Sequence, residues 1–245
     1  MALTDSLIAY WKLDSTSWVD SGPNGLDLTD VNSVANPSGI LNNCANFAGG
    51  GKRLTRSDSS TINPTAALSA SFWIKGSGTI AGVTGKWDHG DGGWSIIRWL
   101  DDDMRCYIGT SGGDYSNYGS WAGVSNATDW FHVVLTYDGS GSTNADKMKA
   151  YVNGTAKTIS FTGTIPGSLL DSAANFEMGR TLAGSGVGEF GGNLDEYALW
   201  SRAITSSEVT EIYNSGSPLP YDDWGGGGGV VVPVLYMHRT TQGMS

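Results

Sequence analysis

The sequence has few of the residues that stabilise a small domain through covalent bonds or a metal. Its 245 residues include two cysteines, Cys44 and Cys106, and three histidines. This excludes a scaffold built on several disulfides and a cysteine-rich or histidine-rich zinc site. A single disulfide between Cys44 and Cys106 is one alternative, but two buried thiols are favoured because free cysteine packs as a small apolar side chain.

Charged residues and long apolar runs are also scarce. Charged residues make up 16% of the chain, against about 25% in average proteins, and the net charge is −10. Nucleic acids and anionic membranes are therefore not expected as partners, because both repel an acidic surface. The sequence lacks the roughly 20 apolar residues of a membrane-spanning helix, so membrane insertion is not expected. The N-terminus shows no secretory signal peptide.

Glycine and aromatic residues are abundant, with 36 Gly, 10 Trp and 10 Tyr. Short segments rich in β-branched and aromatic residues, separated by Gly, Asn and Asp, predict an all-β protein. The expected strands cover residues 7–13, 69–75, 94–100, 104–108, 130–137, 149–152, 176–179 and 194–200. Asn153-Gly154 is the clearest hairpin signal, because a type I′ turn needs positive φ at both central residues. Many short strands between such turns favour a sandwich or jelly roll.

One short helix is predicted near the C-terminus. Thr205 and Glu208 have the spacing of a capping box, and Val209 and Ile212 follow at helical spacing. Gly216 is the expected stop. We expect this helix to lie across one end of the sandwich.

The composition changes after residue 224. Residues 1–224 are the predicted domain, residues 225–229 are five glycines that predict a flexible linker, and residues 230–245 form an apolar tail. We predict that the tail anchors the chain to another structural protein, or to copies of itself, by adding a strand to a sheet edge. The anchoring side chains are Val230, Val231, Val232, Val234, Leu235 and Tyr236. The alternatives are a tail that folds back on its own domain and a disordered end.

The order and spacing of several segments over about residues 6–216 resemble one known family. These segments are residues 9–13, 20–25, 71–75, 130–139, 150–154 and 192–204. Together they resemble the laminin-G-like, concanavalin-A-like lectin jelly-roll family. The resemblance implies a two-sheet antiparallel jelly-roll sandwich with one short C-terminal helix and an extended tail. It specifies the ligand poorly, because this fold carries lectins, adhesion modules and glycosidases.

The resemblance also implies a structural Ca²⁺ ion. Calcium-binding members of the family place an Asp/Asn loop near the N-terminus against an Asp in the last strand, which here are Asp20, Asn24 and Asp195. Because side chains alternate along a strand, Asp195 and Glu196 are expected to point in opposite directions. The alternative is that Asp20 and Asn24 form turns while Asp195 accepts hydrogen bonds from backbone amides.

The middle of the chain supplies candidate ligand contacts. Sugars present apolar C–H faces, and exposed Trp and Tyr rings suit both sugars and protein partners. We predict four such contacts: Trp87, Tyr115, Tyr118 and Trp121. Trp94 and Trp99 are expected to be buried strand residues.

Catalysis is not expected. Glycosidases on this fold carry two carboxylates on one face of a strand, in a Glu-x-Asp-x-Glu pattern that the sequence lacks. The predicted function is a non-enzymatic module for glycan or cell-surface adhesion. The missing signal peptide and the apolar tail favour a virion-associated protein, in a capsid decoration or tail, or another extracellular surface. The alternatives are a free carbohydrate-binding lectin and an endo-glycanase.

Overall fold

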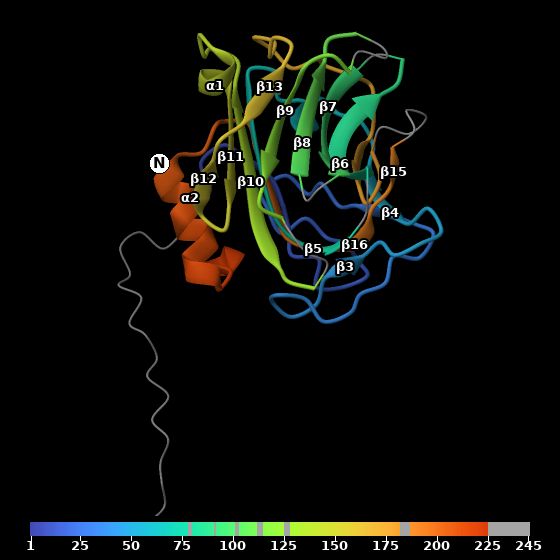
Figure 1. Cartoon of the computed structure of the whole chain (residues 1–245). Helices are drawn as coiled ribbons and strands as arrows, with labels where there is room; N and C mark the ends of the chain where they lie inside the picture. Colours follow the sequence, from blue (N-terminus) through green and yellow to red (C-terminus); the bar gives the residue numbers. More distant parts are fainter. Residues whose placement is uncertain are drawn as a thin grey trace, which may run out of the picture.

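Two β-sheets pack face to face in the part of the chain that the structure describes (Figure 1). This computed structural model describes residues 1–77, 80–90, 92–100, 103–111, 115–124, 128–181 and 187–224. The seven-stranded sheet has the order β1 (Leu7–Trp11), β16 (Gly191–Trp200), β5 (Ala67–Ser77), β10 (Phe131–Asp138), β11 (Met148–Val152) and β12 (Thr155–Lys157), and β3 (Ala45–Asn46) pairs with β16.

The nine-stranded sheet has the order β13 (Ser160–Thr162), β9 (Tyr118–Ala122), β8 (Asp103–Gly109), β7 (Gly92–Arg98), β6 (Ala81–Asp88), β14 (Phe176–Met178), β4 (Arg53–Arg56) and β2 (Thr29–Val31). A short strand, β15 (Gly188–Glu189), pairs with β6 in parallel, whereas the other named pairs are antiparallel. The predicted two-sheet jelly-roll sandwich is confirmed. The predicted segment 94–100 also extends beyond β7, because Trp99 and Leu100 belong to the connection that leads to β8.

The inner faces of the two sheets form the core. Trp11 of β1 stacks on Phe176 of β14 with ring centroids 5.2 Å apart, so these two rings join the sheets. Both Cys44 and Cys106 are buried and unbonded, as the sequence favoured. Burying large aromatic side chains stabilises such a core by about 1.5–3 kcal/mol each.

The hairpin predicted at Asn153-Gly154 connects β11 to β12. Val152 pairs with Thr155, and the two turn residues have φ values of 50° and 71°. A Cβ at position 154 would lie 2.7 Å from Cδ1 of Tyr213, so glycine is required here by space as well as by φ.

The predicted helix is α2 (Ser206–Tyr213), and its capping box is present: Thr205 Oγ1 accepts a hydrogen bond from the Glu208 N–H, and the Glu208 carboxylate accepts one from the Thr205 N–H. The helix ends earlier than expected, because Asn214 adopts the left-handed conformation with φ 43° and takes the role assigned to Gly216.

The expected position of α2 at one end of the sandwich is wrong. The helix covers the outer face of the seven-stranded sheet, beside β11 and β12, with the N-terminus close by (Figure 1). Val209 and Ile212 pack into a cluster with Trp200 of β16, whose neighbour Leu199 belongs to the inner core. Because residues alternate along β16, this outer face carries large apolar side chains that need cover.

The other helical segments are short. Among the described residues they are α1 (Asn144–Lys147), which the sequence did not predict, and the 3₁₀ turns η1 (Ser60–Ile62), η3 (Asn214–Gly216) and η4 (Tyr221–Asp223). No helix in the described part of the chain combines the length and apolar character that crossing a membrane requires.

Candidate functional site

Aromatic side chains gather on the outer face of the nine-stranded sheet. Three of the predicted ligand contacts are among them: Trp87 of β6 stacks on Tyr115, with centroids 5.4 Å apart, and Tyr118 begins β9. Tyr107 of β8, which the sequence reasoning missed, joins them with its ring centroid 4.8 Å from Tyr118. We call Trp87, Trp99, Tyr107, Tyr115 and Tyr118 the aromatic face.

Strand alternation explains why these rings point outward. Cys106 and Ile108 of β8 lie in the core, whereas Tyr107 between them, and Arg105 just before them, point to the other side. Tyr107 pairs directly with Tyr118 across the β8–β9 ladder, so their side chains are neighbours on one face. A period-two reading of 104–108 would have revealed Tyr107.

Three of the tryptophan predictions need correction. Trp87 lies on the outer face, but only 9% of it is exposed, so it is not the exposed ring that the sequence predicted. Trp121 is only 2% exposed and belongs to the core, so it is not a surface contact. It follows Tyr118 by three positions on the same strand, and an odd separation places two side chains on opposite faces. Trp99, expected to be buried, is half-buried at the aromatic face, while Trp94 is buried as expected.

The aromatic face also carries polar groups. His89 Nδ1 lies 2.7 Å from the Tyr115 hydroxyl. The buried indole N–H of Trp87 and the buried hydroxyl of Ser95 have no hydrogen-bond partner within the described residues. The half-buried rings of this face suit a ligand that offers C–H surfaces, and the His89–Tyr115 pair offers polar atoms beside them.

A second cluster lies on the other sheet. Carboxylate oxygens of Asp14, Asp195 and Glu196 all lie within 4.8 Å of one another. We call these three residues the acidic cluster; Asp195 and Glu196 are buried and Asp14 is half-buried.

A β-bulge brings Asp195 and Glu196 to the same side of β16. Asp195 pairs with Trp73 and Ala198 with Ser71, so two residues of β16 lie opposite Phe72 alone. Glu196 has a φ of 49°, in the left-handed region. The expectation that Asp195 and Glu196 point in opposite directions is therefore wrong, because the bulge interrupts the alternation.

Hydrogen bonds satisfy the acidic cluster unevenly. Asp195 Oδ2 accepts from the backbone N–H groups of Ile40, at 2.9 Å, and Leu41, at 3.3 Å. Glu196 accepts from the Tyr10 hydroxyl through Oε2, but its buried Oε1 has no donor within the described residues. Burial raises the pKa of Asp195 and of Glu196 to about 8. Adjacent buried carboxylates with one unmatched oxygen fit a hard divalent cation.

The other two predicted metal ligands lie elsewhere in the hydrogen-bond network. Asp20 accepts from the backbone N–H groups of Tyr10, Gly22 and Leu26, and Asn24 donates to the Ile8 carbonyl. These bonds hold the loop against β1, in agreement with the alternative that Asp20 and Asn24 form turns. Within the described chain, the acidic side chains grouped with Asp195 are Asp14 and Glu196, and Asp20 is not among them.

A recess of about 130 Å³ adjoins the acidic cluster. Asp14, Glu196 and Tyr221 line it, together with Lys12 and Asp222, which form an ion pair at 3.0 Å. Small-molecule sites usually measure about 300–1,000 Å³, so this space suits an ion and water better than a sugar.

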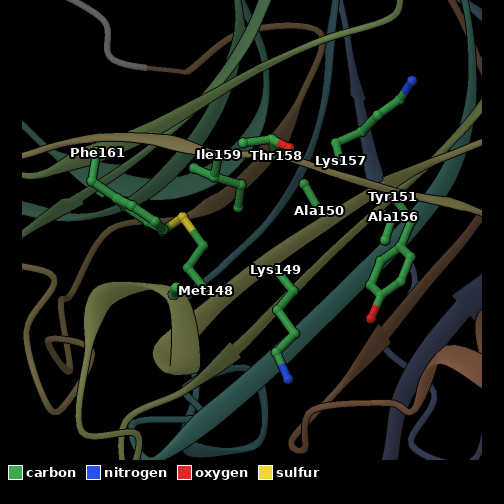
Figure 2. A pocket seen from close by; sticks show the side chains of 10 residues that line it. Met148, Lys149, Ala150, Tyr151, Ala156, Lys157, Thr158, Ile159 and Phe161 are labelled. Atoms are coloured by element: carbon green, nitrogen blue, oxygen red, sulfur yellow. The ribbon is translucent and has the colours of Figure 1, made fainter.

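A larger recess of about 260 Å³ lies beside β11, β12 and β13 (Figure 2). Figure 2 shows the Phe161 ring directed toward Met148, while the amino groups of Lys149 and Lys157 point away from this apolar pair. In a small-molecule site a few polar groups converge on one point, but the polar groups of this recess do not. The predicted anchoring residues 230–236 lie outside the described part of the chain.

Comparisons with known proteins agree with the two-sheet fold. Residues 48–210 match the laminin G family model described as the concanavalin A-like lectin/glucanases superfamily. A comparison with curated proteins finds no match.

Solved structures with this fold include several binding domains. The botulinum neurotoxin DC binding domain, in complex with rat synaptotagmin II, is 13% identical with a TM-score of 0.66, over 87% of this chain and 52% of the toxin domain. The serotype D ligand-binding domain, in complex with N-acetylneuraminic acid, is 16% identical with a TM-score of 0.64, over 89% of this chain and 56% of that one. This chain thus spans about half the length of these toxin domains.

Domain 4 of AbnA is similar over nearly its whole length. This domain of a GH43 extracellular arabinanase from Geobacillus stearothermophilus, in complex with arabinotriose, is 20% identical with a TM-score of 0.60, over 84% of this chain and 97% of the domain. At these identities the likeness shows the shared fold.

Proposed function

Because the chain belongs to the concanavalin A-like lectin/glucanase superfamily, we propose that it is a non-enzymatic module that binds glycans through its aromatic face. The observation that carries this proposal is the gathering of Trp87, Tyr115 and Tyr118 with Tyr107 on the outer face of one sheet. Structures of similar fold that hold arabinotriose or N-acetylneuraminic acid support a glycan ligand.

The arrangement of the carboxylates favours binding over turnover. The acidic cluster lies on the seven-stranded sheet, whereas the aromatic face lies on the nine-stranded sheet. The recess beside the acidic cluster is small, and Asp195 already accepts three backbone hydrogen bonds. A reducing-sugar assay on the glycans that bind tests the endo-glycanase alternative, and release of reducing ends would contradict a pure binding role.

A glycan array with the full chain tests the main proposal. Tyr118→Ala and Trp99→Ala each remove a half-buried ring of the aromatic face, and we expect binding to fall at least tenfold. Tyr221→Ala is the matched control, since this half-buried ring lies on the other sheet against Tyr10. Equal binding by all variants, or an array on which the wild type binds nothing, would contradict the proposal.

The second part of the proposal is a structural Ca²⁺ ion held by Asp14, Asp195 and Glu196. The unmatched Oε1 of Glu196 and the mutual proximity of three carboxylates support it. Asp20 and Asn24, which the family resemblance suggested as ligands, would instead hold the adjacent loop. Such an ion would join the connection after β1 to the last strand and neutralise buried charge.

The third part concerns location. We keep the prediction that the domain is displayed on a virion or another extracellular surface and is tethered by residues 230–236. Truncation after Trp224 should leave thermal unfolding and glycan binding unchanged but abolish association with the structural partner, or self-association, measured by analytical ultracentrifugation. If the truncated chain still associates, the tether is wrong and a free lectin is the better description.

A further inference from the structure

We infer that the aromatic face selects glycans that carry carboxylate groups, and that Arg105 is the residue that recognises them. This inference rests on the proposed glycan-binding function and names its ligand class. The Arg105 guanidinium carbon lies 3.8 Å from the ring centroid of Trp99 and 4.8 Å from that of Tyr118. The cation is thus built into the aromatic face, held by two rings from different segments.

The positive charge of Arg105 is not neutralised by a carboxylate of the described chain. Arg53 and Arg202, by contrast, pair with Glu177 at 3.1 Å and Glu208 at 2.6 Å. The partner of Arg105 is a neutral one, since its Nη1 donates to the Tyr107 hydroxyl at 3.2 Å.

The hydrogen-bonding capacity of Arg105 is also incompletely used. Its Nε is buried and finds no acceptor within the described residues, and the same holds for Nε1 of Trp87 on the same sheet face. Both groups are donors that lie below the surface, whereas Arg105 as a whole is half-buried and can offer the rest of its guanidinium to acceptor oxygens of a ligand. Because this cation has no carboxylate partner among the described residues, it favours a ligand that brings a carboxylate over a neutral one.

A carboxylate on a sugar ring matches this chemistry. Guanidinium groups bind carboxylates through parallel N–H···O hydrogen bonds, while aromatic rings take the C–H faces of the sugar. The aromatic face reaches from β6 to β9, three strand spacings of about 4.8 Å, or about 14 Å in all. A surface of this width suits consecutive units of a chain better than one terminal sugar. The ligand class is therefore a polyuronate.

Isothermal titration calorimetry with two polymers tests the inference. The full chain is titrated with polygalacturonate and with methyl-esterified polygalacturonate, which differ in charge but share the sugar backbone. We expect the acidic polymer to bind at least tenfold more tightly, and higher salt to weaken its binding only. Arg105→Gln should remove this preference, so that the acidic polymer and its ester bind with similar affinity. Arg105→Lys keeps the charge but loses the planar donors, and should restore only part of the preference.

Lys149→Gln is the matched control, because it removes one positive charge at an exposed position on the other sheet. Circular dichroism checks that each variant folds. If Arg105→Gln does not fold, the inference is tested by the salt dependence of wild-type binding and by the polymer preference of Arg105→Lys. Equal affinity for the two polymers, or an Arg105→Gln variant with the wild-type preference, overturns the inference. Binding to sialyllactose without binding to polygalacturonate also overturns it, in favour of a terminal acidic sugar.

The proposed function can be judged separately from this ligand class. Suppose that both polymers bind equally well and that Tyr118→Ala abolishes this binding. The inferred carboxylate preference would then be wrong, whereas the proposed glycan binding at the aromatic face would stand. If neither polymer binds and the glycan array is also blank, both the inference and the proposed function fail.

Discussion

Replacing Glu196 by Gln should stabilise the protein without calcium, and calcium should remove most of this difference between variant and wild type. Glutamine has nearly the shape of glutamate, its amide oxygen still accepts from Tyr10, and its amide can donate toward Asp14 and Asp195. The substitution therefore removes one titratable group from the acidic cluster with little change in packing.

The size of the effect follows from the pKa of Glu196. Burial raises this pKa from 4.5 to about 8. Between these values the folded state holds a proton that the unfolded state has lost, so stability falls as the pH rises through this window. At pH 7, which is 2.5 units above 4.5, holding this proton in the folded state costs about 3 kcal/mol, at 1.36 kcal/mol per pH unit.

Without calcium, Glu196→Gln should raise the free energy of unfolding at pH 7 by up to about 3 kcal/mol. For a chain of this length that corresponds to a Tm increase of up to about 6–12 °C. With calcium the wild type should gain about 2.7 kcal/mol at a hundredfold excess over Kd, and Glu196→Gln should gain much less, because it has lost a ligand oxygen.

Differential scanning calorimetry between pH 5 and pH 8, in EDTA and in CaCl₂, measures both effects. Glu211→Gln, an exposed position on α2, is the control for loss of a negative charge. The reasoning is refuted if Glu196→Gln destabilises the protein in EDTA, or if calcium raises the Tm of wild type and variant equally.

Three further outcomes are expected. Gly154→Ala should lower stability by more than 1 kcal/mol in denaturant unfolding, because φ is 71° there and a Cβ would meet Tyr213; an unchanged midpoint would contradict this. Glu208 is buried, which raises its pKa, but hydrogen bonds from Arg202 and Thr205 outweigh this and lower the pKa to about 2. Its stabilising effect should be complete above about pH 4.5 and lost as the pH falls toward 2, so Glu208→Gln should flatten the Tm profile in that window. Trp121→Ala should cost about 3–5 kcal/mol in chemical denaturation, whereas Tyr118→Ala should cost about 1 kcal/mol; similar losses would place both rings in the same environment.

Sequence patterns that span only a few residues predicted much of the fold. Asn153-Gly154 marked the β11–β12 hairpin, because few residue pairs accept positive φ at two successive positions. The capping box at Thr205 and Glu208 marked the start of α2 for a similarly local reason, since both hydrogen bonds lie within four residues. The position of α2 over the seven-stranded sheet could not be predicted from local patterns, because it depends on which face of β16 remains apolar after the sheets have packed.

The amino-acid sequence alone determined the strands, the turns and the family of the fold, since these follow from preferences of residues that are close along the chain. The tertiary structure decided which aromatic rings face outward, separating Tyr118 from Trp121 on one strand. It also decided which carboxylates meet, because the bulge at Glu196 turns two adjacent acids to one side and the connection after β1 brings Asp14 to them. Both outcomes depend on how distant segments align, and a single displaced residue in a strand exchanges the core face for the surface.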